Sequence, residues 1–213
     1  RSQLFWSMRK GPPLSNVASM RLADPIKDLG LDLSSEQKAT LVEFSKVLLQ
    51  WNKKSNLIAR GDESRVFSRH ILDSLAAASF LVGGKVVDIG SGAGLPGLPL
   101  AIACPQKKFT LCDRMKKRTH FMRFVIANLG IDNAQVVEAP IEEIVSMGKS
   151  YDCAVSRGVG RAADLWPIIE SVIAKTGRLI VYASTQSFGE KLISDAVGNI
   201  HEGGPRISSS AVE

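Results

Sequence analysis

The sequence lacks the long apolar run that a membrane-spanning helix needs. No stretch of about 18 apolar residues occurs in its 213 residues. The first residues, RSQLFWSMRKGPPLS, also lack the apolar core of a secretory signal. The apolar content of 45% suits a globular chain with a sizeable core. These features predict a cytoplasmic protein with no membrane partner.

Cysteine is scarce, and its spacing excludes two kinds of site. The three cysteines are Cys104, Cys112 and Cys153. Their odd number argues against a disulfide framework, and they form no C-x-x-C or His-paired spacing that would indicate zinc. We therefore expect buried thiols and no metal site.

Acidic residues are almost absent from one short window, residues 107–123. This window holds seven lysines and arginines against one acid, Asp113, while the whole chain carries a formal net charge of +6. A basic run of this kind is typical of a solvated helix face or of a surface that binds a polyanion. Both interpretations remain open from the run alone.

The first part of the chain is predicted to be helical. Ser34 and Gln37 have capping-box spacing, and apolar residues then recur on one helical face as far as Trp51. A second helical segment is expected over residues 63–81. The Gly83-Gly84 pair follows it and marks a boundary. We expect an N-terminal helical extension over residues 1–82 and a second domain over residues 83–213.

Beyond Gly84, short β-rich runs alternate with helical ones. The five predicted strands are KVVDI, KFTLC, AQVVEA, YDCAVS and GRLIVYA. A helix with an apolar stripe behind the basic window is predicted over residues 115–129, and a sixth helix over residues 187–197. This alternation predicts an α/β fold with a doubly wound, mostly parallel, Rossmann-like sheet.

A glycine-rich loop, VVDIGSGAGLPGLPLA at residues 86–101, follows the first predicted strand. Residues 92–97 fit G-x-G-x-x-G, and Asp113 lies 21 residues after Gly92, as in dinucleotide-binding folds. Two features oppose that interpretation: Asp88 stands where an apolar residue is usual, and about 100 residues remain for any substrate domain. A nucleotide-dependent oxidoreductase is kept as a minor alternative.

The pattern D-x-G-x-G-x-G fits S-adenosylmethionine better. Gly90 and Gly92 let the backbone approach the cofactor, and Asp88 can order the turn. Asp113, which ends the second predicted strand, can accept hydrogen bonds from both ribose hydroxyls. After the third strand, Ile141 and Glu142 fall where the adenine would lie. We predict a methyl-donor site.

The classes of methyl acceptor differ in which residues they require after the fourth predicted strand. The segment VSRGVG lacks the Asn/Asp-Pro-Pro-aromatic pattern of amino-nitrogen methyltransferases, and the Cys104-Pro105 pair lies too far away to serve as a cytosine-attacking thiolate. Guanine N7 needs neither, because its lone pair attacks without losing a proton. No catalytic residue is therefore assigned. Arg157 either binds a guanine or phosphate or ties a loop to a carboxylate.

Six segments together make a specific resemblance: WNKKSNLIAR, SRHILDSL, DIGSGAGLPGLPLA, LCDRMKKR, and the IEE and VSRG segments. Over about residues 30–185 the chain resembles the small-subunit rRNA guanine-N7 methyltransferase G family, also called glucose-inhibited division protein B. The resemblance implies a class I S-adenosylmethionine-dependent fold. It also implies that Gly90, Leu95, Ile141, Glu142 and Arg157 contact the cofactor.

The implied reaction makes N7-methylguanosine in 16S rRNA near the decoding site. The implied partner is the small ribosomal subunit or an assembly intermediate, bound by a monomer. A catalytically silent rRNA-binding assembly factor with the same fold is the alternative.

The sequence departs from the family in three places. Pro140 replaces a frequent arginine, and residues 182–184 replace a lysine and a glycine. The family's C-terminal strands are not recognisable in GGPRISSSAVE, residues 203–213, so we expect them to be truncated or missing.

Overall fold

The computed structural model describes residues 26–182, 192–195 and 200–202. Its helical elements are, in chain order, α2 (Ser35–Ser55), η1 (Arg60–Arg65), η2 (Val66–Leu72), α3 (Asp73–Leu75), η3 (Ala78–Phe80), α4 (Gly97–Ala103), α5 (Lys116–Leu129), α6 (Ile141–Ser146), α7 (Ala162–Ile169) and η4 (Glu170–Val172). Its strands are β1 (Lys85–Ile89), β2 (Lys108–Cys112), β3 (Ala134–Val137), β4 (Tyr151–Arg157), β5 (Ile173–Tyr182), β6 (Leu192–Asp195) and β7 (Ile200–Glu202).

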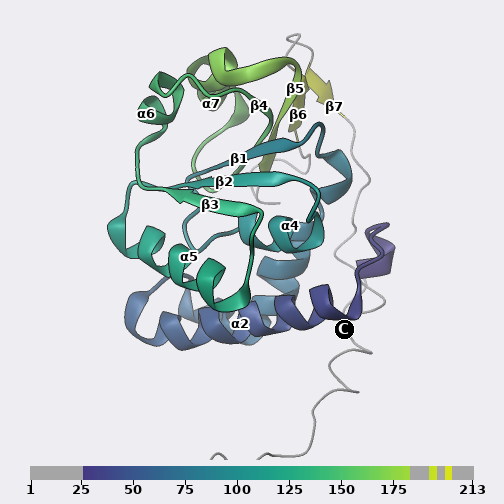
Figure 1. Ribbon diagram of the computed structural model, residues 1–213, viewed down its shortest axis with the longest axis vertical. Helices are drawn as coiled ribbons and strands as arrows, with labels where there is room; N and C mark the ends of the chain where they lie inside the picture. Colours follow the sequence, from purple (N-terminus) through teal and green to yellow (C-terminus); the bar gives the residue numbers. More distant parts are fainter. Residues whose placement is uncertain (1–25, 183–191, 196–199, 203–213) are drawn as a thin grey trace, which may run out of the picture.

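The predicted doubly wound sheet is confirmed. The strand order is β3-β2-β1-β4-β5-β6-β7, with the first five strands parallel and β6 and β7 antiparallel to their neighbours. In Figure 1, α4 and α5 cover one face of the sheet, with α2 beyond them, while α6 and α7 cover the other. The order reverses between β1 and β4, which is where such sheets bind ligands.

Two hydrophobic cores, one on each face, hold these layers together. The larger core joins α2, α4 and α5 to the side chains of one sheet face, including Phe44, Phe109 and Phe121. The smaller core joins α6 and α7 to the opposite face. The larger core draws residues from both sides of Gly83, so the N-terminal helices pack directly on the sheet domain.

The helix expected at Ser34 is confirmed together with its cap. The backbone N–H of Gln37 donates to Ser34 Oγ at 3.1 Å, and the backbone N–H of Ser34 donates to Gln37 Oε1 at 2.8 Å. The second helical segment is present but irregular: η1 and η3 are 3₁₀ helices, and η2 is a π-helix. A π-helical turn is rare and often lies at a functional site.

The prediction of a sixth helix over residues 187–197 is wrong at residues 192–195. These residues form β6, which pairs antiparallel with β5 and satisfies backbone groups that would otherwise line an open sheet edge. The rest of the predicted helix, and residues 203–213, lie outside the described residues.

Within the described part of the chain, no helix is both long and apolar enough to span a membrane.

Candidate functional site: a cavity at the carboxyl ends of the strands

The sheet register brings the predicted site residues to one edge. Ile89 of β1 pairs with Cys112 of β2 and with Ser156 of β4. In a parallel sheet the residues that follow such partners emerge side by side. The glycine loop, Asp113 and Arg157 therefore meet at the carboxyl edge, although they are far apart in the sequence.

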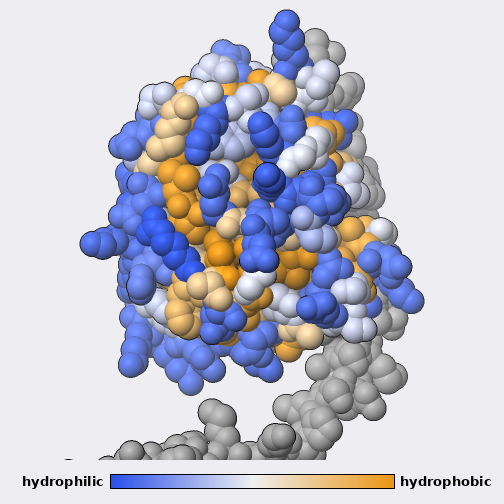
Figure 2. Space-filling view, in the orientation of Figure 1, coloured by the Kyte–Doolittle hydropathy of each residue, from blue (hydrophilic) through white to orange (hydrophobic). Residues whose placement is uncertain are grey.

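A cavity of about 580 Å³ lies at this edge. All seven residues predicted to bind the cofactor line it: Gly90, Gly92, Leu95, Asp113, Ile141, Glu142 and Arg157. Its volume falls within the range of small-molecule sites. Figure 2 shows hydrophobic residues within a hollow on this side of the molecule, surrounded by hydrophilic ones.

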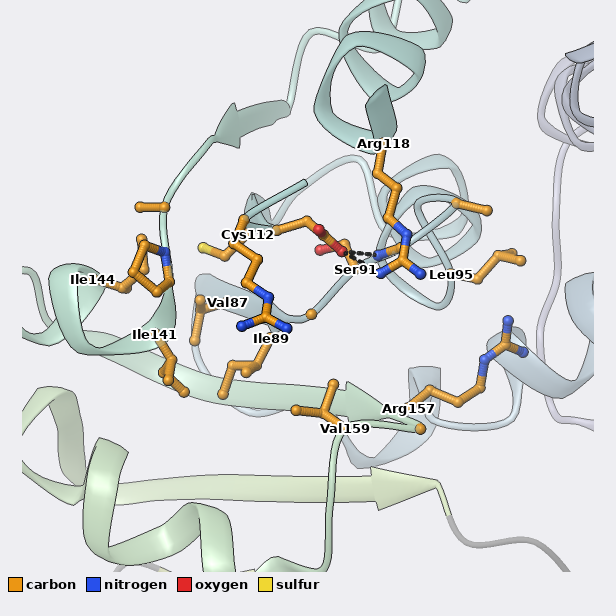
Figure 3. A pocket seen from close by; sticks show the side chains of 18 of the residues that line it. Val87, Ile89, Ser91, Leu95, Cys112, Arg118, Ile141, Ile144, Arg157 and Val159 are labelled. Carbon is orange, nitrogen blue, oxygen red and sulfur yellow. Dashed lines mark hydrogen bonds and ion pairs between the residues drawn. The ribbon is translucent and has the colours of Figure 1, made fainter. Parts of the chain in front are cut away.

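The two ends of the cavity differ in chemistry. Ile141 and Ile144 of α6 lie at one end, and Arg118 and Arg157 lie toward the other (Figure 3). The apolar end can pack against a flat ring, and the guanidinium end can bind anionic or hydrogen-bond-accepting groups.

The glycine loop needs glycine where its backbone passes close to other groups. Gly90 has a φ of +66°, and a Cβ there would lie 2.3 Å from Val159 Cγ2. At Gly97, where α4 begins, a Cβ would lie 2.1 Å from Leu111 Cδ2 and 2.5 Å from Asp88 Oδ2. The loop is thus fitted against β2 and against the segment that follows β4.

Asp88 orders this loop, as the sequence predicts. Its Oδ2 accepts a hydrogen bond from the backbone N–H of Gly97 at 2.9 Å, and Ser91 Oγ donates to its backbone oxygen at 3.0 Å. Its side chain is fully buried, and Oδ1 has no hydrogen-bond partner among the described residues. Burial raises the pKa of Asp88 to about 7.

Replacing Gly97 with alanine is expected to lower the free energy of unfolding by about 1–3 kcal/mol, because the new methyl group displaces Leu111 and the Asp88 carboxyl. Denaturant unfolding measures this change. Gly61→Ala is the matched control, since a Cβ at Gly61 meets nothing within 4 Å. Equal stability of the two variants would contradict the close fit of the loop.

Asp113 is buried against the same loop. Its Oδ2 accepts from the Gly92 N–H at 2.9 Å, and its Oδ1 accepts from the Met115 N–H at 2.8 Å. Arg118 Nη1 lies 3.3 Å from Oδ2. A carboxylate offers about four acceptor positions, so one position remains for a ligand hydroxyl, and a second if Arg118 turns away. Two backbone bonds fix the orientation of the acid.

Arg157 has the carboxylate partner that the sequence left as an alternative. Its Nη1 lies 3.4 Å from Asp73 Oδ2, on a residue 84 positions earlier in the chain. Its side chain is 20% exposed and still lines the cavity. The ion pair therefore connects the end of β4 to α3 and holds Arg157 at the cavity wall.

His70 is a cavity residue that the sequence left unassigned. It lies on the π-helix η2, and its Nε2 is 3.5 Å from Asp62 Oδ2. Burial and the nearby Arg157 lower its pKa, which favours the neutral imidazole. In the sequence, only the segment RHILDSL draws attention to His70. Its position near Arg157 at the end of β4 depends on tertiary packing, which local spacing does not encode.

Further lining residues come from two segments that gave no specific cofactor signal. Leu57 and Ile58 follow α2, and Val159 follows β4.

Arg114, directly after Asp113, also lines the cavity and has no ion-pair partner among the described residues. With Arg118 and Arg157 it makes three guanidinium groups around one cavity, against the two carboxylates of Asp113 and Glu142, and Arg118 and Arg157 each lie in an ion pair.

The three cysteines are buried, as predicted. Burial raises the pKa of Cys112 to about 12 and of Cys153 to about 11, and also raises the pKa of Cys104. Their thiols therefore stay protonated near neutral pH. Among the described residues, no group of three or more His, Cys, Asp or Glu is placed to hold a metal ion.

Comparisons with known proteins agree on one family. The model of the GidB family, rRNA small subunit methyltransferase G, matches residues 37–204. Ribosomal RNA small subunit methyltransferase G of Methylococcus capsulatus is 36% identical over 160 residues, covering 72% of this chain and 78% of that protein. The Escherichia coli protein of the same name is 37% identical over 145 residues, covering 68% and 70%.

Among solved structures, a methyltransferase from Geobacter sulfurreducens matches with a TM-score of 0.48. It is 19% identical and covers 76% of each chain.

Proposed function

The chain belongs to the rRNA small subunit methyltransferase G family, and we propose how its residues carry out the family reaction, methyl transfer from S-adenosylmethionine to N7 of a guanine in 16S rRNA. The observation that carries this proposal is the cavity at the carboxyl edge of the sheet. It combines a close-fitting glycine loop, a buried carboxylate and an apolar end.

The lining residues fit S-adenosylmethionine. Asp113 is held against the loop and accepts hydrogen bonds from the ribose hydroxyls. Ile141 packs on a face of the adenine, with Glu142 beside it on α6. Gly90, Gly92 and Leu95 form the wall beneath the rest of the cofactor. The bound cofactor supplies an electrophilic methyl group on its sulfonium.

The cationic end of the cavity suits the acceptor. Arg157, at this end, holds the guanine or its adjoining phosphate so that N7 lies in line with the methyl group, and Arg114 on the cavity wall adds a further cation. The N7 lone pair forms the new N–C bond while the S–C bond breaks, and no proton leaves. Alignment and exclusion of water therefore do most of the catalysis, within the roughly 7–11 kcal/mol that orientation supplies.

The Asp73–Arg157 ion pair positions this end. Since Arg157 is anchored to α3, its guanidinium is held in place before the substrate binds. His70, neutral and half-buried beside it, adds an uncharged wall. Neither group needs to act as a general base.

We also propose that the chain works as a monomer on the small ribosomal subunit or an assembly intermediate, in the cytoplasm where that substrate lies. The support for this substrate is the family to which the chain belongs, which is named for methylation of small-subunit rRNA. Residues 1–82 are proposed as the helical extension and residues 83–213 as the methyltransferase domain, joined through the larger core.

Labelled methyl transfer to small subunits from a strain lacking the modification tests the function. Nuclease digestion followed by nucleoside identification should yield N7-methylguanosine. Binding of S-adenosylmethionine without transfer would instead favour the silent assembly factor. Thermal stabilisation by NAD(H) but not by S-adenosylmethionine would favour the oxidoreductase.

Lys116, the first residue of α5, is expected to contact an RNA phosphate. It is exposed and has no ion-pair partner among the described residues. Lys116→Glu should weaken binding to small subunits and reduce the slope of log K against log salt by about one or more, because fewer counterions are released. Lys175→Glu, an exposed site near the start of β5, is the control. An unchanged salt slope for Lys116→Glu would rule out this contact.

A further inference from the structure

Four aromatic side chains cluster where α2 and α5 pack together. The ring of Trp51, on α2, lies 5.7 Å from that of His120, 5.3 Å from that of Phe121 and 5.2 Å from that of Phe124, between ring centroids. All three pairs are tilted, at 53°, 60° and 42°. These are favourable aromatic geometries, so the rings support one another.

The cluster is anchored on one side and open on the other. Phe121 is fully buried in the larger core, whereas Phe124 is 41% exposed. Trp51 is half-buried and His120 is exposed. We call Trp51, His120 and Phe124 the aromatic surface. A surface that is rigid beneath and exposed above loses little conformational entropy when a flat group covers it.

Residues close in the chain to the aromatic surface line the cavity. Leu57 and Ile58, just beyond the end of α2, line the cavity, and so does Arg118 in the first turn of α5. In Figure 1, α2 and α5 lie side by side on the same face of the sheet. Phe124 lies six residues after Arg118, about 9 Å along the axis of α5 and about a third of a turn around it, so a chain that leaves the cavity at Arg118 reaches the aromatic surface by crossing the first turns of α5.

Cations flank the aromatic surface on both helices. Lys54 lies one turn beyond Trp51, and Lys117 lies one turn before His120, so each shares a helical face with its aromatic neighbour. Both lysines are exposed and neither has an ion-pair partner in the described part of the chain. Aromatic side chains beside unpaired cations are typical of surfaces that stack bases and bind the intervening phosphates.

We propose that the aromatic surface stacks an unpaired base of the rRNA close to the methylated guanine, while Lys54 and Lys117 bind the adjoining phosphates. The proposal rests on the proposed function, since it extends the RNA path outward from the same cavity. The flanking charge favours a single-stranded RNA segment over a protein partner, for which exposed lysines around an apolar centre are less suitable.

Substitutions at Phe124 test the stacking directly, because this side chain is 41% exposed and its loss leaves Phe121 in the core. Phe124→Ala and Phe124→Leu should each raise the KM for a protein-free 16S rRNA fragment about fivefold or more, while Phe124→Tyr should keep it. The kcat and the Kd for S-adenosylmethionine should stay unchanged. Ile168→Ala, which removes a 38% exposed apolar side chain from α7, is the matched control.

Trp51 gives a second readout that does not depend on turnover. Titration with a single-stranded oligoribonucleotide of the fragment's loop sequence should quench the emission of the wild-type protein and should quench Trp51→Phe much less. Full binding by Phe124→Leu, or equal quenching in Trp51→Phe, would overturn the proposal. So would a loss confined to assembled subunits, which would indicate a protein partner.

These outcomes separate the two proposals. If the wild-type protein makes no N7-methylguanosine but its Trp51 emission still responds to RNA, the proposed reaction fails and the aromatic surface stands. If methylation proceeds and all Phe124 variants match the wild type, only the aromatic surface fails.

Discussion

The free energy of unfolding is expected to fall as the pH rises from about 5 to about 7, and Asp88→Asn should remove most of this fall. Burial raises the pKa of Asp88 from its ordinary 3.8 to about 7. Between these values the folded chain keeps a proton that the unfolded chain releases, so rising pH favours unfolding. A difference of about three pKa units corresponds to roughly 4 kcal/mol in full.

The contribution of Asp88 to the free energy of unfolding therefore changes with pH in the opposite direction from that of a carboxylate whose pKa is lowered by folding. Its contribution is complete below about pH 4 and is lost by about pH 7, above which it changes no further. The carboxyls with a lowered pKa, Asp152, Glu138 and Asp164, lose their contributions only at still lower pH. A window from about pH 5 to 8 isolates the effect of Asp88.

His70 titrates in part of the same window with the opposite effect. Its pKa is lowered, so the unfolded chain gains a proton first as the pH falls, and stability declines toward acid. Comparing wild type with Asp88→Asn at each pH cancels this contribution. Urea unfolding of the cofactor-free proteins supplies the measurement, and identical pH profiles would show that Asp88 ionises freely in the folded state.

Sequence reasoning predicts the parts of this fold that local patterns determine. The capping box satisfies backbone N–H groups at the start of α2 through hydrogen bonds between Ser34 and Gln37 alone, so the four residues 34–37 suffice to identify the helix start. The strands β1, β2 and β4 are short apolar runs that are buried almost throughout, and each of the five parallel strands begins within a few residues of its predicted start. The helix prediction was wrong at residues 192–195 because β6 forms through its pairing with β5, which local sequence does not encode.

The side of the cavity that holds the glycine loop and Asp113 could be predicted because it follows the strand order. Asp113 and the glycine loop each come directly after a strand, and a parallel sheet places such residues at one edge. The substrate side was not predictable to the same degree. The Arg157–Asp73 ion pair and the position of His70 depend on how the irregular helices η2 and α3 pack against β4, which no local spacing encodes.

Asp113→Ala is expected to raise the Kd for S-adenosylmethionine at least about 100-fold. Two hydrogen bonds from ribose hydroxyls to the carboxylate, the second made when Arg118 turns away from Oδ2, are worth about 1.5–3 kcal/mol each, and every 1.4 kcal/mol is a factor of ten. S-adenosylhomocysteine should lose the same factor, because the contact involves the ribose and not the methyl group. Isothermal titration calorimetry measures both values.

The same carboxylate also accepts the N–H groups of Gly92 and Met115, so the variant loosens the loop as well as losing the ribose contact. Asp113→Asn separates these effects: it keeps an acceptor for one N–H and removes the charge, so its affinity should fall between wild type and Asp113→Ala. Asp132→Ala, an exposed acid beyond the end of α5, controls for net charge. If Asp113→Ala binds S-adenosylmethionine within about threefold of the wild-type affinity, another group accepts the ribose hydroxyls. Glu142 would then be the first residue to substitute, because it lines the same cavity.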